Sequence, residues 1–476
     1  MAHLTFKAPA ELSFGFDAIR AELDIAKTFP VEVLDEADHA PLLDVFRRDA
    51  TALPFIAIDP PGSTDLDQAF HAAPRGDGYR VHYTIADVAS FVRPGSAIDL
   101  EARNRGVTLY SPDQRSPLHP ARLSEDRASL LPNGERPALV WTIDLDSDGI
   151  PVTANLERAM VRIREAISYQ EAQARIDGGP GTAGWNESLE LLRTIGRLRQ
   201  AREADRGGVS LNLPAQEVVK TKDGYTLEFD NALPVEGWNA QISLLTGIVA
   251  GTTMADAGVG ILRTLPTPTE DALRTLRHQA RALEINWPEG LAYPDFIRGV
   301  VPDSPQSAAF MLKAARSLRG AGYVGFNGAI PSHPEHGAIA SIYSHVTAPL
   351  RRLVDRFGNE ILLAIYGDTE PPAWALEALD DLPSIMGRAR SKESALDREV
   401  LGLAEAAVLE PHVGSNFDAF VVDLNERREQ AVIQLREPAV VAEIPIAGRE
   451  LAERVLVRLE RVDILHRAVD FKVVTQ

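Results

Sequence analysis

Three aspartates lie close together directly after a short apolar run. Phe55–Ile58 is followed by Asp59, a Pro-Pro-Gly turn, and then Asp65 and Asp67, so three carboxylates fall within nine residues. Carboxylates held a few ångströms apart raise one another's pKa unless a cation compensates their charge. Ligands that are all oxygen suit Mg²⁺ or Mn²⁺ better than zinc. The spacing therefore indicates either a catalytic divalent-metal site or a solvated acidic turn.

A calcium-binding EF-hand loop does not fit this stretch. Counting from Asp59 places Thr64 at the sixth position, where the loop needs glycine, and Phe70 at the twelfth, where it needs glutamate. From the residues alone, a metal-dependent phosphoesterase acting on a small phosphate ester is one function that fits.

Further motifs follow the aspartates in a fixed order, and together they resemble the ribonuclease II and ribonuclease R exoribonuclease family. The aspartate run has the form Ile58-Asp59-Pro60-x3-Thr64-Asp65-Leu66-Asp67. The later matching segments are Ile85-Ala86-Asp87-Val88, Gly95-Ser96-x-x-Asp99, Glu101-Ala102-x-x-Arg105-Gly106, Leu123-Ser124 and Tyr343-x-His345-x-Thr347-Ala348-Pro349-Leu350-Arg351-Arg352. The resemblance implies processive, Mg²⁺-dependent hydrolysis of single-stranded RNA from its 3′ end, which releases nucleoside 5′-monophosphates.

The resemblance also implies roles for individual residues. Asp59, Asp65 and Asp67 would hold two divalent ions about 4 Å apart, one activating water and the other stabilising the leaving 3′ oxygen. We expect Asp67 to be the most important for chemistry, because its family counterpart lies deepest in the acidic cluster. Arg351 is the expected electrophile, since a guanidinium can bind two phosphate oxygens and offset charge that grows in the transition state.

The expected RNA contacts come from the same resemblance. Tyr110 occupies the place of a family aromatic that stacks on RNA bases, and such stacking tolerates any base. Leu211 aligns with the opposing aromatic, and leucine has no π face, so we expect a one-sided grip on the terminal nucleotides. Arg352 and His345 are the other expected RNA-binding residues.

Gln68 is a departure from the family pattern, which usually ends the acidic run with two adjacent aspartates. Its neutral amide can still coordinate weakly or accept a hydrogen bond from a metal-bound water, so we expect Gln68 to belong to the metal site with altered affinity or slower turnover. The alternative is a catalytically weakened RNA-binding regulator on the same fold, which protects 3′ ends.

Composition limits where and how this chain acts. The 476 residues carry a formal net charge of −19 and no cysteine, which excludes disulfide scaffolds and cysteine-ligated metals and fits the cytoplasm. The start shows no basic segment followed by an apolar run, so we expect no export, and no apolar run reaches the ~18 residues of a membrane helix. The charge opposes phosphate approach over most of the surface, so any RNA site must be a local basic channel. We expect single-stranded RNA 3′ ends as partner, and no protein partner or membrane.

Periodicity predicts a multidomain α+β protein. Residues 1–50 should form a small helical element, with helical spacing at Phe16, Ile19 and Leu23 and again over residues 42–46. Residues 51–410 should form the large mixed catalytic domain. Residues 411–476 contain five alternating segments that predict an OB-type β barrel or an all-β cap without special function. Those segments are Phe417–Leu424, Ala431–Leu435, Val440–Ile446, Val455–Leu459 and Val469–Val474.

Overall fold

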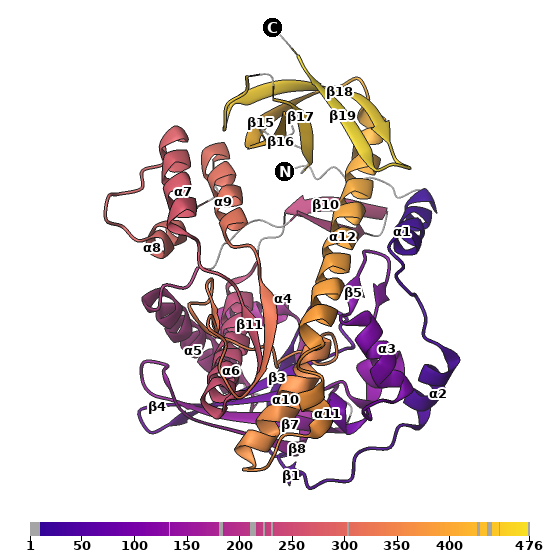
Figure 1. Cartoon of the computed structure of the whole chain (residues 1–476), viewed down its shortest axis with the longest axis vertical. Helices are drawn as coiled ribbons and strands as arrows, with labels where there is room; N and C mark the ends of the chain where they lie inside the picture. Colours follow the sequence, from indigo (N-terminus) through magenta and orange to yellow (C-terminus); the bar gives the residue numbers. More distant parts are fainter. Residues whose placement is uncertain are drawn as a thin grey trace.

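The computed structural model confirms a mixed α+β protein with several parts (Figure 1). It describes residues 10–132, 134–179, 184–209, 216–221, 224–229, 232–301, 304–425, 429–435, 440–446 and 448–474. Within these ranges, no helix combines the length and the apolar character that crossing a bilayer requires.

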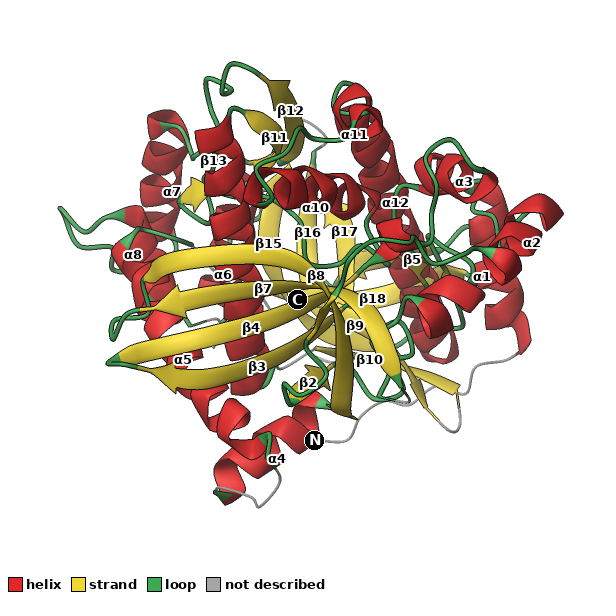
Figure 2. Cartoon of the chain, turned by 90° about the horizontal axis from the view of Figure 1, so that it is seen from below, coloured by secondary structure: helices red, strands yellow, loops and turns green. Residues whose placement is uncertain are grey.

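The centre of the molecule is a six-stranded sheet with the strand order β1-β8-β2-β3-β4-β7 (Figure 2). Strand β7 also pairs with the long strand β8, so the sheet closes on itself. The strand bounds are β1 Arg48–Asp49, β2 Phe55–Ile58, β3 Gln68–Arg75, β4 Gly78–Ala86, β7 Glu135–Leu145 and β8 Pro151–Ile167.

The loop that carries Asp59, Asp65 and Asp67 connects β2 and β3 of this sheet. All four residues of β2 are buried, β2 pairs in parallel with β8, and Ile56 pairs with Phe70 of β3. A buried apolar strand that is paired on both sides cannot shift without exposing its side chains. The residues between β2 and β3, 59–67, are therefore held at both ends.

Helices and smaller strand pairs surround the sheet. The helices are α3 Ala97–Arg105, α4 Tyr169–Gly178, α5 Asn186–Asp205, α6 Pro234–Ala257, α7 Glu270–Ala282, α8 Tyr293–Arg298, α9 Pro305–Ser317, α10 Leu353–Tyr366 and α11 Ala373–Glu377. The strand pairs are β5 Leu109–Tyr110 with β6 Arg115–Ser116, β9 Gln216–Thr221 with β10 Gly224–Phe229, β11 Val259–Thr264 with β12 Gly322–Asn327, and β13 Glu335–His336 with β14 Ser341–Ile342. Residues from the sheet, α5 and α6 share one apolar core.

Helix α6 lies directly against the segment that leads to Arg351. Gly247 and Gly251 face this segment: a Cβ on Gly247 would lie 2.7 Å from the Ser344 carbonyl oxygen, and one on Gly251 would lie 2.9 Å from Tyr343 backbone atoms. The Ser344 N–H also donates to the Gly247 carbonyl at 3.0 Å. The small residues of α6 thus let two backbones approach closely and fix the start of the segment.

Helix α12, Leu382–Leu409, runs from the region around the central sheet to the C-terminal sheet (Figure 1). This sheet has the order β17-β16-β15-β18-β19, and its two edge strands contact each other, so it is nearly closed. The five predicted strands are confirmed as β15 Asn416–Asn425, β16 Gln430–Leu435, β17 Val441–Pro445, β18 Arg454–Asp463 and β19 Ala468–Val473. The domain boundaries at residues 50 and 410 stay predictions.

The N-terminal segment contains α1, Ala10–Glu22, and α2, Val31–His39. Phe16 and Ile19 are buried in a core shared with α12 and the C-terminal sheet. The expected helical turn over residues 42–46 is wrong: this stretch is irregular, and Phe46 is 87% exposed. The spacing of its apolar residues resembles a helix by chance, because no partner surface covers them.

We expect Gly247→Ala to lower the midpoint of thermal unfolding, followed by circular dichroism. The new methyl group would lie 2.2 Å from Cε2 of Tyr343, and such overpacking typically costs ~1–3 kcal/mol. Gly387→Ala in α12 is the matched control, since nothing lies within 4 Å of its Cβ position and alanine favours a helix. Equal midpoints for the two variants would show that Gly247 does not set this spacing.

Candidate active site

The loop over residues 59–67 is fastened by its backbone as well as by its flanking strands. Leu66 is buried, its N–H donates to Ser129 Oγ at 2.9 Å, and its carbonyl accepts from the Leu130 N–H at 2.9 Å. The Asp67 carbonyl accepts from the Ala86 N–H at 2.9 Å. These bonds fix the backbone from which the Asp65 and Asp67 side chains project.

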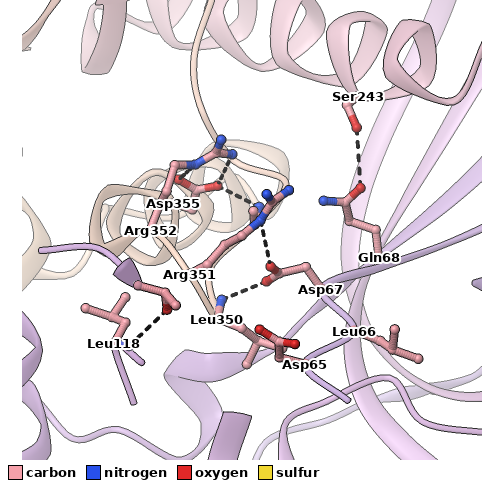
Figure 3. A network of polar contacts seen from close by, with 12 residues as sticks. Asp65, Leu66, Asp67, Gln68, Leu118, Ser243, Leu350, Arg351, Arg352 and Asp355 are labelled. Atoms are coloured by element: carbon pink, nitrogen blue, oxygen red, sulfur yellow. Dashed lines mark hydrogen bonds and ion pairs between the residues drawn. The ribbon is translucent and has the colours of Figure 1, made fainter. Parts of the chain in front are cut away.

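Asp67 joins this loop to a segment far along the chain (Figure 3). Its Oδ1 accepts from the Leu350 N–H at 2.7 Å, and its Oδ2 lies 3.3 Å from Nε of Arg351. Burial raises the pKa of Asp67 to about 8, although Arg351 and the Leu350 hydrogen bond both act to lower it. The structure therefore places two of the predicted catalytic residues, Asp67 and Arg351, in direct contact.

The segment that carries Arg351 is held by Asp355 at the start of α10. The Asp355 carboxylate accepts from the Ala348 N–H at 2.6 Å, and it forms a two-bond ion pair with Arg352 at 2.8 and 3.0 Å. The Thr108 N–H donates to the Arg351 carbonyl at 2.9 Å. The predicted RNA-binding residue Arg352 is thus engaged by Asp355, while the Arg351 guanidinium is directed to Asp67.

Asp65 is bound by the β5–β6 hairpin. Its Oδ1 accepts a short hydrogen bond from Arg115, and its Oδ2 lies 3.4 Å from the Tyr110 hydroxyl. Arg115 also pairs with Glu125 at 2.8 Å and donates to Thr64 Oγ1 at 2.7 Å. Arg115 therefore places a positive charge between two carboxylates.

Asp59 differs from the other two aspartates. Within the part of the chain that the structure describes, no hydrogen-bond or ion-pair donor reaches its carboxylate. Burial raises the pKa of Asp59 to about 6; Arg351 opposes the shift and Asp65 adds to it. Asp59 is therefore a partly buried, unengaged carboxylate beside the Arg351 charge.

The amide oxygen of Gln68 points toward Ser243 of α6 (Figure 3). Its Oε1 accepts a short hydrogen bond from Tyr83 and lies 3.4 Å from Ser243 Oγ. The Tyr83 and Ser243 hydroxyls are themselves 2.8 Å apart. The amide oxygen that would ligate a metal is thus already used by two hydroxyls.

These contacts test whether the site fits a divalent cation. No group of three or more histidine, aspartate or glutamate side chains in the described ranges is arranged to hold a metal. Asp59 has free oxygens, whereas Asp65 and Asp67 are engaged by arginines. Mg²⁺ commonly uses one or two protein carboxylates, with water and substrate phosphate completing its shell. The residues therefore fit a cation held through Asp59, with the metal roles of Asp65, Asp67 and Gln68 remaining predictions.

A cavity of about 400 Å³ lies beside Arg351 and contains the other predicted RNA-binding residues that the structure describes. Tyr110 is half exposed on its wall. His345 also lines the cavity, but burial lowers its pKa well below the ordinary value, and its Nδ1 lies 2.6 Å from the Tyr323 hydroxyl. His345 therefore contributes a neutral ring. Leu211 lies outside the described residues.

Sequence reasoning missed several residues of this site. Arg263, Arg390 and Tyr323 line the same cavity, yet they stand in no recognisable motif. Arg115 could have been found: the Ser-Pro-Asp-Gln stretch after Tyr110 is typical of a turn, and a tight hairpin there places Arg115 opposite Tyr110. The cavity wall thus carries more positive charge than the motifs alone indicated.

Comparison with known proteins identifies the family. Residues 47–367 match the RNB domain, and residues 415–474 match the RNase II-type exonuclease C-terminal S1 domain. The first match alone covers more than half of the chain. This chain therefore belongs to the RNB family, as its motifs predicted.

Individual relatives agree with this assignment. The exosome complex exonuclease RRP44 homolog A of Arabidopsis thaliana is 29% identical over 338 residues, which are 67% of this chain and 36% of the relative. The solved structure of Mycoplasma genitalium RNase R with ribose-methylated single-stranded RNA has a TM-score of 0.87 and 20% identity, over 97% of this chain and 78% of that one. Yeast Ssd1, a pseudonuclease, has a TM-score of 0.73 and 18% identity, over 94% and 57% respectively.

The extent of these matches limits what they say. The chain spans about a third of the length of the Arabidopsis relative. The two solved structures are too distant in sequence to show more than the fold, and one of them is a pseudonuclease. Activity therefore has to be argued from the residues of this site.

We expect the free energy of unfolding of the wild type, measured in EDTA, to decrease as the pH rises. The decrease should be steeper than that of the Asp67→Asn variant. An unfolded aspartate releases its proton near pH ~4, whereas burial raises the pKa of Asp67 to about 8. Between these values the folded protein holds a proton that the unfolded chain has released, so stability decreases with pH. Asparagine does not titrate. Unfolding midpoints of both proteins from pH 4 to 9 would test this, and parallel curves would contradict it.

Proposed function

We propose that this chain is a cytoplasmic, divalent-cation-dependent exoribonuclease that hydrolyses single-stranded RNA processively from its 3′ end to nucleoside 5′-monophosphates. The main supporting observation is the buried contact of Asp67 with Leu350 and Arg351 beside the unengaged Asp59. Membership of the RNB family and the arginine-lined cavity next to Arg351 support the same function.

Arg351 has the central electrostatic role in this proposal. Its guanidinium can bind oxygens of the scissile phosphate and offset the negative charge that develops in the transition state. Asp67 holds Nε of Arg351, which fixes the orientation of the guanidinium before RNA arrives. The Arg351 side chain is 47% exposed, so it is open to a phosphate, and a charge that is already oriented needs no reorganisation when the transition state forms.

Asp59 is the residue best suited to hold the cation, since its oxygens are free. Mg²⁺, or Mn²⁺ in its place, supplies Lewis-acid activation of water and charge neutralisation when bound. The pKa of Asp59, raised to about 6, leaves the carboxylate largely ionised at neutral pH. Asp59 thus keeps its negative charge for a ligand role.

The cavity beside Arg351 supports binding of a flexible, charged strand. Its wall combines Arg263, Arg352 and Arg390 with the half-exposed ring of Tyr110. Arginines attract the phosphates and an aromatic ring stacks on a base of any sequence, at about 1–3 kcal/mol per base. This local basic surface lets a chain of formal charge −19 bind RNA at one place.

A catalytically weakened RNA-binding regulator is the second candidate. Gln68 replaces a carboxylate of the usual family pattern, and its oxygen is engaged by Tyr83. Arg115 also neutralises Asp65. The similar fold of the pseudonuclease Ssd1 shows that this architecture occurs without nuclease activity.

The decisive assay uses single-stranded RNA labelled at either the 5′ or the 3′ end, incubated with Mg²⁺ or with EDTA. We expect labelled mononucleotide to appear at once from the 3′-labelled strand, gradual shortening of the 5′-labelled strand, and no cleavage in EDTA. Asp67→Asn should lower the rate at least ~100-fold, because the amide keeps only one accepting oxygen for the Leu350 N–H and Nε of Arg351, while RNA affinity changes little.

Asp177→Asn is the matched control, since Asp177 is exposed on α4, and it should cleave at the wild-type rate. RNA binding without cleavage by the wild type would favour the regulator instead. Failure to bind RNA would contradict both candidates and favour a phosphoesterase acting on small esters. Equal loss of cleavage and affinity in Asp67→Asn would mean that Asp67 has only a structural role.

A further inference from the structure

The β5–β6 hairpin contacts the catalytic loop with both residues of one cross-strand pair. Tyr110 and Arg115 face each other in the hairpin. Arg115 binds one oxygen of Asp65, and the Tyr110 hydroxyl lies 3.4 Å from the other. The hairpin is short, so a displacement of its turn moves both residues together. The position of the exposed Tyr110 ring relative to Asp65 therefore depends on what holds the turn.

The turn of the hairpin is held by the N-terminal helix α1. Both terminal nitrogens of Arg20 donate to the Asp113 carboxylate, at 2.8 and 2.7 Å. Asp113 lies in the turn between β5 and β6, and Arg20 is only 1% exposed. Asp17 of α1 also accepts from Arg20, which orients the guanidinium. A buried two-bond contact of this kind is specific in geometry as well as favourable in energy.

Helix α1 is itself fixed on its other sides. A Cβ on Gly15 would lie 2.6 Å from Cδ2 of Leu403, so α1 packs tightly on α12. Glu22 at the end of α1 pairs at 2.6 Å with Arg467, in the turn between β18 and β19 of the C-terminal sheet. Figure 1 shows α1 beside α12, on the same side as β5. The helix thus connects the C-terminal sheet and α12 to the hairpin.

We propose that Arg20 is a positioning residue, which holds the β5–β6 hairpin through Asp113 so that Tyr110 stacks on the 3′-terminal nucleotides at a fixed distance from the catalytic loop. This inference rests on the proposed function. It assigns to the N-terminal helix a role in RNA binding, although none of residues 15–22, the part of α1 whose side chains are described, lines the cavity beside Arg351.

The Arg20–Asp113 contact should affect RNA binding and the hydrolysis step differently. Arg20 contacts neither Asp67 nor Arg351: Leu350 binds Asp67, and Asp355 holds the segment that carries Arg351. The Thr108 N–H that holds the Arg351 carbonyl lies before β5, at the opposite end of the hairpin from Asp113. Loss of the Arg20–Asp113 contact should therefore weaken the stacking of the terminal bases while the hydrolysis step stays intact. In kinetic terms, KM should rise and kcat should change little.

The test uses the full-length protein and a single-stranded RNA with 2-aminopurine as its 3′-terminal base, whose fluorescence decreases on stacking. Binding is measured in EDTA, and kcat and KM are measured in Mg²⁺. Tyr110→Leu should abolish the decrease in fluorescence. Arg20→Gln and Asp113→Asn should each remove most of it and weaken binding about three- to tenfold, within the range for loss of one stacked base. For both variants kcat should change less than about twofold, as expected when only binding is lost.

Two further variants complete the design. Arg20→Lys keeps the charge but not the two-bond geometry, so it should recover the fluorescence decrease in part. Arg162→Gln removes a surface arginine that pairs with Glu135 at 2.9 Å, and it should match the wild type. If Arg20→Gln does not fold, Asp113→Asn decides, since the Asp113 side chain is 17% exposed and lies in a turn.

The possible outcomes distinguish the two proposals. If the wild type binds this RNA with a fluorescence decrease and Asp113→Asn behaves like Arg162→Gln, the positioning role is wrong while the proposed function stands. A proportional fall in kcat with unchanged fluorescence would also overturn it. If the wild type fails to bind the RNA, the proposed function itself is wrong, and the positioning role is wrong with it.

Discussion

The contact between Asp67 and the segment of Leu350 and Arg351 is the interaction on which the rest of the site depends. The two parts are 283 residues apart in sequence, and each is independently fixed, one by the central sheet and the other by Asp355. A buried carboxylate is costly unless hydrogen bonds and a nearby positive charge support it. Asp67 has both, and they oppose the rise that burial causes in its pKa, which is still about 8.

The three aspartates near this contact differ in whether an arginine binds them. Asp65 is bound by Arg115 and Asp67 by Arg351, whereas no donor in the described part of the chain reaches the Asp59 carboxylate. The neighbouring cavity concentrates arginines although the chain as a whole is strongly acidic. Under the proposed function, this cavity is the place where a negatively charged strand would bind, because repulsion from the remaining surface opposes binding elsewhere.

Much of the architecture could be predicted because it is local. The five strands of the C-terminal sheet follow from alternating side chains, and the order of the motifs is enough to indicate the RNB family. The helical turn predicted over residues 42–46 fails because apolar spacing shows a helix only where a partner surface exists.

The fine structure of the site could not be predicted in the same way. Motifs name Asp65 and Gln68, but they do not show that Arg115 and Tyr83 occupy their oxygens. Those partners come from elements distant in sequence, so only the fold brings them together. The same holds for Arg20 and Asp113, which are 93 residues apart.

The most direct measurement of the central claim is a double-mutant cycle with Asp67→Asn and Arg351→Gln, read as the single-turnover rate of RNA cleavage. If Asp67 acts by holding Arg351, the double variant should be about as slow as the slower single variant, because the second substitution removes an interaction already lost. Effects that multiply in the double variant would show that the two residues act independently and would contradict this account.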